Sequence, residues 1–483
     1  MTYLIKNQIC KIKNIPENVK ATIVFGIASF AISGLKYIMT PIFTRILSTS
    51  EYGIVSIYNS WLAIVQVIIS MTLIYPGILN VGLYEHKENR WKYLSTMEGI
   101  ITTVSCCSFI LYLIFHSFFV DLIGIPSSLL TLMLITCVFQ PASSLWTAKQ
   151  RYEYKYRITF LVTVGTALLA QLCSVIYVIC KQDSGKNLAE ALLWSSGLVN
   201  IAVSLVLYIY IMLKGKTFYD SKLWKETFIV TIPLIPHYLS HVLLNGTDKI
   251  MIGRMVGADK AGVYNLAAVL SSIGILFWRA LLTTFSPFVN TKIGERKFED
   301  IRKAIKPLWI FTGGICVVGA LLSPEIIRIF GTKEYLEGIY AVPPVVAGIF
   351  TYAMYDAFAA VSFFHKKSFN IMLASVTAAA SNIIMNYFGI KIFGFVAAGY
   401  TTLFSHLILI LMHYLNIKKI ENERVYDGKL SLALLICVTG SCLLCSLLYT
   451  KFPGMRYMLA FCILGILFKM RKTLYQALAD MKV

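Results

Sequence analysis

The sequence has little charge. Only 14% of its 483 residues are Asp, Glu, Lys or Arg, whereas a soluble globular domain has about 25%. Hydrophobic residues make up 57%, and apolar runs of the ~20 residues that a helix needs to cross a bilayer recur along the chain. A membrane barrel would instead show alternation in segments of ~10 residues. The sequence therefore predicts an all-α polytopic membrane protein and excludes a soluble globular one.

Catalytic motifs are also missing. There is no GxxxxGK[ST] phosphate loop, no GxSxG, no HExxH and no DxD-type cluster in a large loop. The longest loops have about 15 residues, too few for the active site of a membrane glycosyltransferase or polymerase. Most of the eleven Cys lie in apolar runs, and the CxxC pair Cys442 and Cys445 has no second pair or nearby His to complete a metal site. We predict a transporter rather than an enzyme, with no catalytic residues, metal or cofactor.

The apolar runs predict about fourteen spanning helices. Pro233, Pro236 and Pro287 predict breaks in the seventh and eighth of them, as suits helices that bend beside a substrate path. The predicted spans are 21–44, 52–76, 96–119, 128–148, 158–180, 188–213, 227–247, 261–288, 307–330, 341–364, 369–390, 393–415, 430–450 and 455–469.

Acidic residues are scarce: 24 Asp and Glu stand against 44 Lys and Arg, a net charge of +20. Such an excess could indicate nucleic-acid binding, but the loops that alternate along the chain differ in composition. One set, with both termini, holds 31 of the 44 basic residues, the other set holds 11, and two lie inside helices. Basic residues collect in cytoplasmic loops. We therefore predict that the basic loops and both termini are cytoplasmic, and that no nucleic acid is a partner.

A weak internal repeat relates residues 36–53 to residues 245–262, at a shift of 209 positions. Arg45 falls on Arg254, and Gly53 falls on Gly262. Six spans separate the copies, so the repeats are parallel and related by an axis along the membrane normal. This predicts two six-helix lobes, a central cavity and alternating access. The predicted parts are an N-lobe at 1–213, a cytoplasmic connector at 214–226, a C-lobe at 227–416, and helices 13–14 with a tail at 417–483.

The four repeated helices each carry a polar stripe at helical spacing. An ionisable residue within a span usually faces water or a partner, and two of these stripes contain a cation, Lys36 or Arg279. The stripes are Ser29, Ser33, Lys36, Thr40 and Thr44 in helix 1; Asn59, Gln66 and Ser70 in helix 2; His237, His241, Asn245 and Asp248 in helix 7; and Asn265, Ser272, Arg279, Thr283 and Ser286 in helix 8.

Structural interpretations of these residues remain open at this point. Lys36 could extend to a membrane interface, as long basic side chains do. Arg279 could be a structural partner of Asp356, a third charge within a span. The two histidines of helix 7 could be packing residues, and Asp248 at the end of that helix is most simply explained by loop electrostatics.

Three segments carry a family resemblance: TPIFTRILSTSEYGIVSIYNSW at 40–61, PASSLWTAKQRYEYKYR at 141–157 and TDKIMIGRMVGADKAGVYNLA at 247–267. With them, nearly the whole chain resembles the polysaccharide transporter branch of the multidrug/oligosaccharidyl-lipid/polysaccharide exporter superfamily, the flippases of O-antigen and capsule repeat units. The resemblance implies a bacterial cytoplasmic membrane protein. It also implies that an oligosaccharide on undecaprenyl diphosphate moves from the cytoplasmic to the periplasmic leaflet by alternating access, with a proton or sodium gradient as the candidate driving force.

A lipid diphosphate is an anion, so cationic side chains suit it, and Arg offers a planar multidentate fork. We expect Lys36 and Arg279 to attract the diphosphate and the polar stripes to accommodate the sugars. The expected stripe residues are Ser33, Thr40, Asn59, Gln66, Asn245 and Ser272. The candidates for ion coupling are Asp356, Asp248, His237 and His241.

Two other functions remain open. A cation-coupled drug exporter of the same superfamily would need acidic residues in the cavity, and helices 1 and 2 contain none there. A non-transporting scaffold that assembles with polysaccharide polymerase would tolerate changes at the intramembrane residues and not in the loops. The expected partners are the lipid-linked oligosaccharide, membrane lipids and polymerase machinery.

Overall fold

The computed structural model describes residues 16–182 and 187–481. Every regular element in these ranges is helical, and fourteen helices are long and apolar enough to cross a membrane. The prediction of an all-α membrane protein with about fourteen spans is therefore confirmed. Asp side chains cap two of the helices. Asp220 accepts hydrogen bonds from the backbone N–H groups of Lys222 and Leu223, and Asp427, directly before the thirteenth span, accepts them from those of Lys429 and Leu430.

The first half of the chain contains six of the spanning helices and three short ones. In chain order the helices are α2 (Glu17–Ile46), α3 (Thr49–Ile69), α4 (Pro76–Glu85), α5 (Arg90–Ile114), α6 (His116–Ile123), α7 (Ser127–Tyr152), α8 (Tyr156–Lys181), α9 (Leu188–Gly215) and α10 (Ser221–Thr231).

The second half contains the other eight spans, with α10, η2 and α11 forming the seventh helix of the chain. The elements are η2 (Ile232–Leu234), α11 (Ile235–Met255), α12 (Ala258–Gly294), α13 (Phe298–Leu321), α14 (Ser323–Phe330), η3 (Lys333–Tyr340), α15 (Val342–Phe364), α16 (Ser368–Phe393), α17 (Ala397–Ile420), α18 (Gly428–Leu444), η4 (Cys445–Leu447), α19 (Leu448–Lys451) and α20 (Pro453–Asp480).

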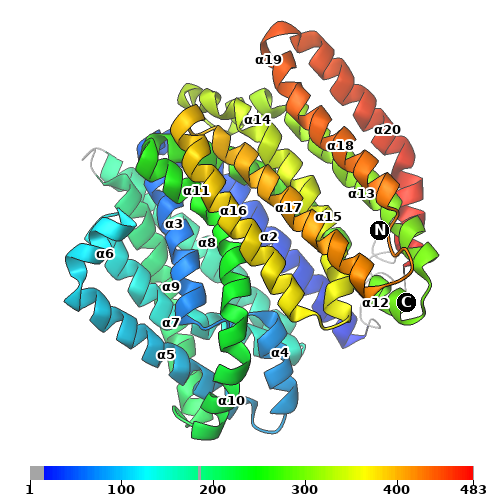
Figure 1. Cartoon of the computed structure of the whole chain (residues 1–483). Coiled ribbons are helices and arrows are strands. Elements are labelled where there is room, and N and C mark those ends of the chain that lie inside the picture. The colour runs from blue at the N-terminus through cyan, green and yellow to red at the C-terminus, as the bar shows by residue number, and fades with distance from the viewer. Residues whose placement is uncertain (1–15, 183–186, 482–483) are drawn as a thin grey trace, which may run out of the picture. The chain divides into compact units, whose positions relative to one another are not determined.

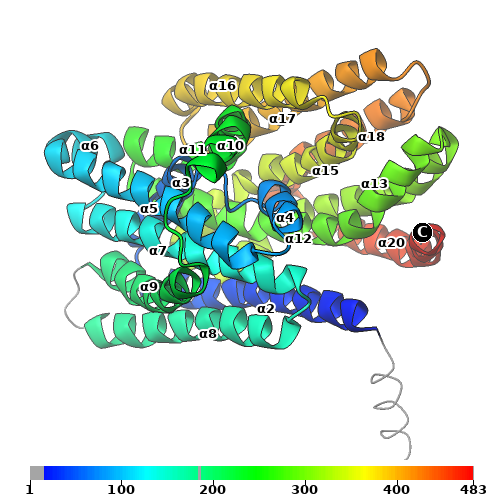
Figure 2. The same cartoon turned by 90° about the horizontal axis from the view of Figure 1, so that it is seen from below.

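The chain divides into two compact units: residues 1–46 with 61–235, and residues 47–60 with 236–483. In the first unit, α7, α8 and α9 pack on one another, and α2 lies along α8 (Figure 2). In the second unit, α16 and α17 run side by side and α15 packs against α17 (Figure 1). α18 and α20 form the last hairpin, and both pack on α13. The predicted lobe boundary at 214–226 remains a prediction.

The prolines act differently in the two helices that they were expected to break. Pro233 lies in the 3₁₀ turn η2, which separates α10 from α11, so the predicted break in helix 7 is confirmed. Pro287 lies inside α12, which continues unbroken to Gly294, so the predicted break there is wrong. A proline removes one backbone hydrogen bond, and neighbouring helices make this tolerable within a membrane.

The two glycines related by the repeat lie against each other in the second unit. A Cβ atom on Gly53 of α3 would lie 1.7 Å from the carbonyl oxygen of Ala258, and one on Gly262 of α12 would lie 2.0 Å from the carbonyl oxygen of Thr49. Each glycine thus lets the backbone of the other helix approach. The first turns of α3 and α12 cross symmetrically, as expected where two copies of one motif meet.

Candidate functional site

Lys36 is the charged residue of the polar stripe on α2, in the first unit. It lies ten residues before the end of the helix, about 15 Å along the axis, which is too deep for easy extension to that interface. Its side chain is exposed, and none of the ion pairs found among the described residues involves it. Thr40, one turn on, is buried and donates a 2.8 Å hydrogen bond to the carbonyl of Lys36. The cation is therefore free to bind an anion.

Arg279 is the corresponding cation of the second unit, on α12. It is exposed, and it lies close enough to Tyr352, Asp356 and His241 to interact with them electrostatically. Asp356 accepts a 3.1 Å hydrogen bond from the indole of Trp278. No ion pair between Arg279 and Asp356 is found in the described part of the chain. The structural-partner interpretation is therefore only partly supported, and the guanidinium keeps donors free.

Four of the seven histidines of the chain lie near one another, in a group that we call the histidine cluster, and His241 of this group interacts with Arg279. His237 and His241 come from α11, and His406 and His413 come from α17. Tyrosines of α15 join them: the ring of Tyr352 lies 6.3 Å from that of His241 and 6.4 Å from that of His406, and the ring of Tyr355 lies 5.1 Å from that of His413.

Several imidazole nitrogens of the histidine cluster are buried without a hydrogen-bond partner. They are Nδ1 of His237, Nδ1 of His406 and both ring nitrogens of His413. An unsatisfied buried polar group costs ~1–3 kcal/mol, so these imidazoles do not serve stability alone. The sequence pointed to His237 and His241, but it missed His406 and His413 because they lie about 170 residues later, in a helix that had shown no stripe.

Asp248 is the centre of a second buried group, the Asp248 network. Its carboxylate accepts hydrogen bonds from Tyr264 at 2.8 Å, Asn386 at 2.7 Å and Thr402 at 2.8 Å. Asn386 also donates to Asn382, which donates to Thr402, so the bonds close into a ring. The expectation that Asp248 lies at a helix end and acts on loop electrostatics is wrong, because the side chain is 4% exposed and joins α11, α12, α16 and α17.

The remaining predicted site residues differ in exposure. Asn59 and Asn245 are exposed, and each amide donates to its own helix, at 2.9 Å to Val55 and 2.7 Å to His241. Ser33, Gln66 and Ser272 are partly buried. Ser272 donates to the carbonyl of Val269 at 2.6 Å. Of the predicted ion-coupling residues, the structure places His241 and Asp356 near Arg279, and His237 next to His241.

One intramembrane acid escaped the sequence analysis. Glu98 of α5 in the first unit is fully buried, and neither carboxylate oxygen has a hydrogen-bond partner. It lies close to the basic end of its predicted span, where a surface position was the simpler expectation. No group of three or more His, Cys, Asp or Glu side chains suited to a metal ion is found within residues 16–182 and 187–481.

Two ion-pair clusters at the ends of the spans explain other charged motifs. Glu153, in the segment 141–157, contacts Lys149 at 2.6 Å, Lys155 at 2.8 Å and Arg90 at 3.5 Å. Its partial burial would raise the pKa, but the hydrogen bonds from the two lysines outweigh burial and lower it. This cluster closes the turn between α7 and α8, so that motif is structural.

Glu325, at the start of α14, pairs with a residue of α20. Arg456 is 3% exposed and binds both carboxylate oxygens, at 2.6 and 2.7 Å, while the hydroxyl of Tyr457 donates at 2.6 Å. Burial of Glu325 would raise the pKa, but these hydrogen bonds lower it. The pair attaches the last hairpin to the segment after α13.

Comparisons with known proteins place the chain among membrane transporters. Residues 19–289 match the family described as polysaccharide biosynthesis protein, and residues 233–388 match MatE. The capsular polysaccharide biosynthesis protein CapF of Staphylococcus aureus is 26% identical over 33% of this chain and 42% of its own length. The probable multidrug resistance protein NorM of Mannheimia succiniciproducens is 22% identical over 41% of this chain and 45% of its own length. The chain thus spans less than half the length of the two curated relatives that it matches.

Solved structures share the fold over most of the chain. The lipid II flippase MurJ, in an inward closed conformation, has a TM-score of 0.67 at 17% identity, with 93% of this chain and 99% of that chain covered. A multidrug resistance MATE transporter in an inward-facing conformation has a TM-score of 0.62 at 11% identity, with 84% and 99% covered. The fold of these transporters is therefore shared by this chain, and its resemblance to the multidrug/oligosaccharidyl-lipid/polysaccharide exporter superfamily is confirmed. This chain belongs to the polysaccharide biosynthesis protein family.

Proposed function

We propose that this chain is a flippase that moves a lipid-linked oligosaccharide, carried on undecaprenyl diphosphate, from the cytoplasmic to the periplasmic leaflet of a bacterial inner membrane. It would do so by alternating access and supply units for O-antigen or capsule synthesis, beside a polysaccharide polymerase. In this topology both termini are cytoplasmic, as the distribution of Lys and Arg predicts.

The observation that carries the proposal is the state of Arg279. An exposed guanidinium in the middle of a spanning helix is costly, and such residues mark substrate paths. Arg279 keeps donors free for a ligand, and its neighbours include His241 and Tyr352 as well as Asp356. A diphosphate can accept several of these donors at once. Lys36 gives the first unit a second exposed cation of the same kind.

The competing proposal is an ion-coupled exporter of cationic compounds. A cationic drug is best bound by a free intramembrane carboxylate, but the described intramembrane acids are hydrogen-bonded or fully buried. Asp248 accepts three hydrogen bonds, Asp356 accepts one from Trp278 beside Arg279, and Glu98 is fully buried. The exposed intramembrane charges are both positive, and this favours an anionic substrate.

Coupling to a proton or sodium gradient is part of the proposal. The histidine cluster with Asp356 offers groups that can take up and release protons. The Asp248 network offers carboxylate, amide and hydroxyl oxygens, the ligands that hard cations prefer. The amide of Asn386 and the hydroxyls of Tyr264 and Thr402 donate to the carboxylate, so sodium would first have to displace those hydrogen bonds. Flipping in proteoliposomes under an imposed pH gradient, and separately a sodium gradient, distinguishes the two.

The test of function is a gene deletion in the source bacterium. We expect surface polysaccharide to be lost and unflipped lipid-linked units to accumulate, with export restored by the wild type. Arg279→Ala should reduce export at least tenfold, since a hydrogen bond to a charged group is worth ~1.5–3 kcal/mol. Arg279→Lys should restore part of it, because a point charge lacks the multidentate fork.

Arg157→Ala, at an exposed arginine after α7, is the matched control and should export normally at equal membrane abundance. Normal surface polysaccharide in the deletion, with new sensitivity to cationic compounds, would instead establish the drug exporter. Full export by both Arg279→Ala and Lys36→Ala would refute the cationic site. Silent intramembrane variants together with defective loop variants would indicate a scaffold.

A further inference from the structure

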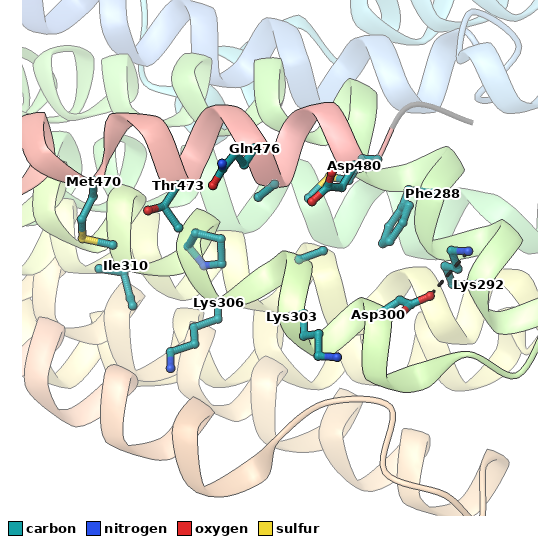
Figure 3. A pocket seen from close by; sticks show the side chains of 14 residues that line it. Phe288, Lys292, Asp300, Lys303, Lys306, Ile310, Met470, Thr473, Gln476 and Asp480 are labelled. Carbon is teal, nitrogen blue, oxygen red and sulfur yellow. Dashed lines mark ion pairs between the residues drawn. The ribbon is translucent and has the colours of Figure 1, made fainter.

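The second unit has a groove outside the site described above, at the end of the molecule where α12 ends, α13 begins and α20 ends. It has a volume of about 590 Å³, within the ~300–1,000 Å³ typical of ligand pockets. Its floor is apolar, with Phe288, Pro307, Ile310 and Met470 among the lining residues. Figure 3 shows Thr473 and Gln476 of α20 turned toward α13 across this floor.

Lysines form the rim of the groove. Lys303 and Lys306 lie three residues apart on α13, and Figure 3 shows both ammonium groups directed outward from the groove, with their stems beside the floor. Lys292 of α12 is the third lining lysine. Helical spacing also places Lys469 on the same face of α20 as Thr473, one turn before it.

The acids near the groove leave part of this charge uncompensated. Asp300 is 3.6 Å from Lys292, which also pairs with Glu295 at 3.0 Å. Lys303 pairs with Glu299 at 2.7 Å, but both side chains are about 70% exposed, and such surface pairs contribute little and exchange readily. Lys306 is exposed and takes part in none of the ion pairs found among the described residues. Two acids line the groove: Asp300 is the one near a lysine, and Asp480 takes part in none of the ion pairs found in the described ranges, so its charge opposes an anion.

The surroundings identify the kind of ligand. α20 buries only 17% of its spanning window inside the protein, and side chains such as Phe461 and Phe468 are exposed, so lipid is the solvent on this side. The loops at this end belong to the basic set, which predicts the cytoplasmic face and its anionic lipids. Basic pockets between spanning helices on that face suit lipid headgroups.

We propose that this groove binds one anionic membrane phospholipid. An acyl chain lies on the apolar floor between α13 and α20, and the phosphodiester is held at the rim by Lys303 and Lys306. The bound lipid joins the last hairpin to α12 and α13 on this face, and the site is separate from the one proposed for the transported substrate.

The test uses the purified full-length protein in nanodiscs of phosphatidylcholine, with and without phosphatidylglycerol, and in neutral detergent for native mass spectrometry. We expect phosphatidylglycerol to raise the melting temperature and to remain bound at a stoichiometry of one. Lys303→Gln/Lys306→Gln should weaken this binding ~30-fold, since each lysine contributes ~1 kcal/mol toward an anionic lipid and ~1.4 kcal/mol is a factor of ten.

The matched control is Lys366→Gln/Lys367→Gln, another exposed pair of lysines at the basic face of the same unit, which should bind phosphatidylglycerol like the wild type. Equal binding by the test and control variants would overturn the proposal. An equal stabilisation by inorganic phosphate would show a free-anion site, and displacement of phosphatidylglycerol by undecaprenyl diphosphate would show that the groove belongs to the substrate path. Either result would overturn it. A test variant that elutes as a monodisperse peak and transports normally would show that the change is confined to the lipid site.

Discussion

The crossing of α3 and α12 predicts that an alanine at Gly262 is poorly tolerated. The new Cβ would lie 2.0 Å from the carbonyl oxygen of Thr49 and 2.9 Å from the amide nitrogen of Gly53, where ordinary contact begins at 3.4 Å. Both atoms are backbone, so no side chain can rotate away, and the helices must separate by more than an ångström.

The cost follows from the two opposing effects. Overpacking of this kind costs ~1–3 kcal/mol or more, whereas replacing glycine by alanine inside a helix returns ~0.5–1 kcal/mol. We expect Gly262→Ala to lose about 2 kcal/mol of stability, which is a fall of several degrees in melting temperature, measured by size-exclusion chromatography of heated detergent extracts.

Gly440→Ala in α18 is the control, since nothing lies within 4 Å of its Cβ position, and it should be as stable as the wild type or more so. The double variant Gly53→Ala/Gly262→Ala should cost less than the sum of the single changes, because one separation of the helices relieves both clashes. If Gly262→Ala and Gly440→Ala had the same melting temperature, the close approach of the two backbones would be refuted.

Three further outcomes are expected from buried polar groups, each checked by thermal unfolding of the purified protein. Asp248→Asn should destabilise the protein by ~2–4 kcal/mol, because an amide cannot accept all three hydrogen bonds. Asn245→Ala should leave the stability unchanged. If the two variants had the same melting temperature, the Asp248 network would be contradicted. Arg456→Gln should lower the melting temperature at neutral pH, because α20 then loses its ion pair with Glu325. Because the pKa of Glu325 is lowered, its ion pair stabilises the fold at pH values above the ordinary pKa of 4.5, and this stabilisation is lost as the pH falls below it. The melting temperatures of the variant and the wild type should therefore converge in acid. His413→Phe should keep or raise the melting temperature while export falls, and unchanged export would exclude His413 from coupling.

The sequence was enough to predict the class of the fold because the membrane leaves few alternatives. A run of about 20 apolar residues has to be a helix when no water can satisfy its backbone. Lys36 and Arg279 stood out for the same reason, since a charge is conspicuous among apolar neighbours. Hydropathy does not show where short helices begin and end: α4 follows a predicted span, whereas α6 begins inside the predicted span 96–119 and α14 lies inside the predicted span 307–330.

The polar groups of the second unit could not be predicted in this way. A stripe on one helix shows which face is polar, but not which distant helix supplies the partners. Asp248 looked like a helix-end residue because the predicted span ended at 247, and its partners Asn386 and Thr402 lie 138 and 154 positions later, where the sequence does not connect them to it. His406 and His413 were missed because the sequence of α17 does not show which distant side chains they meet, and only the fold brings them to His241 and to the tyrosines of α15.

The same separation along the chain has a consequence for synthesis. At ~5–20 residues per second, Asn386 and Thr402 leave the ribosome on the order of ten seconds after Asp248. During that interval α11 and α12 contain a carboxylate whose single available partner from its final set is Tyr264, 16 residues on. A carboxylate without its partners is costly within lipid, so this hairpin should stay at the insertion machinery or near its water until α16 and α17 arrive. A chain cut short before Ser368 should therefore be recognised as incomplete and degraded, because Asp248 in its seventh spanning helix lacks the partners that the eleventh and twelfth supply.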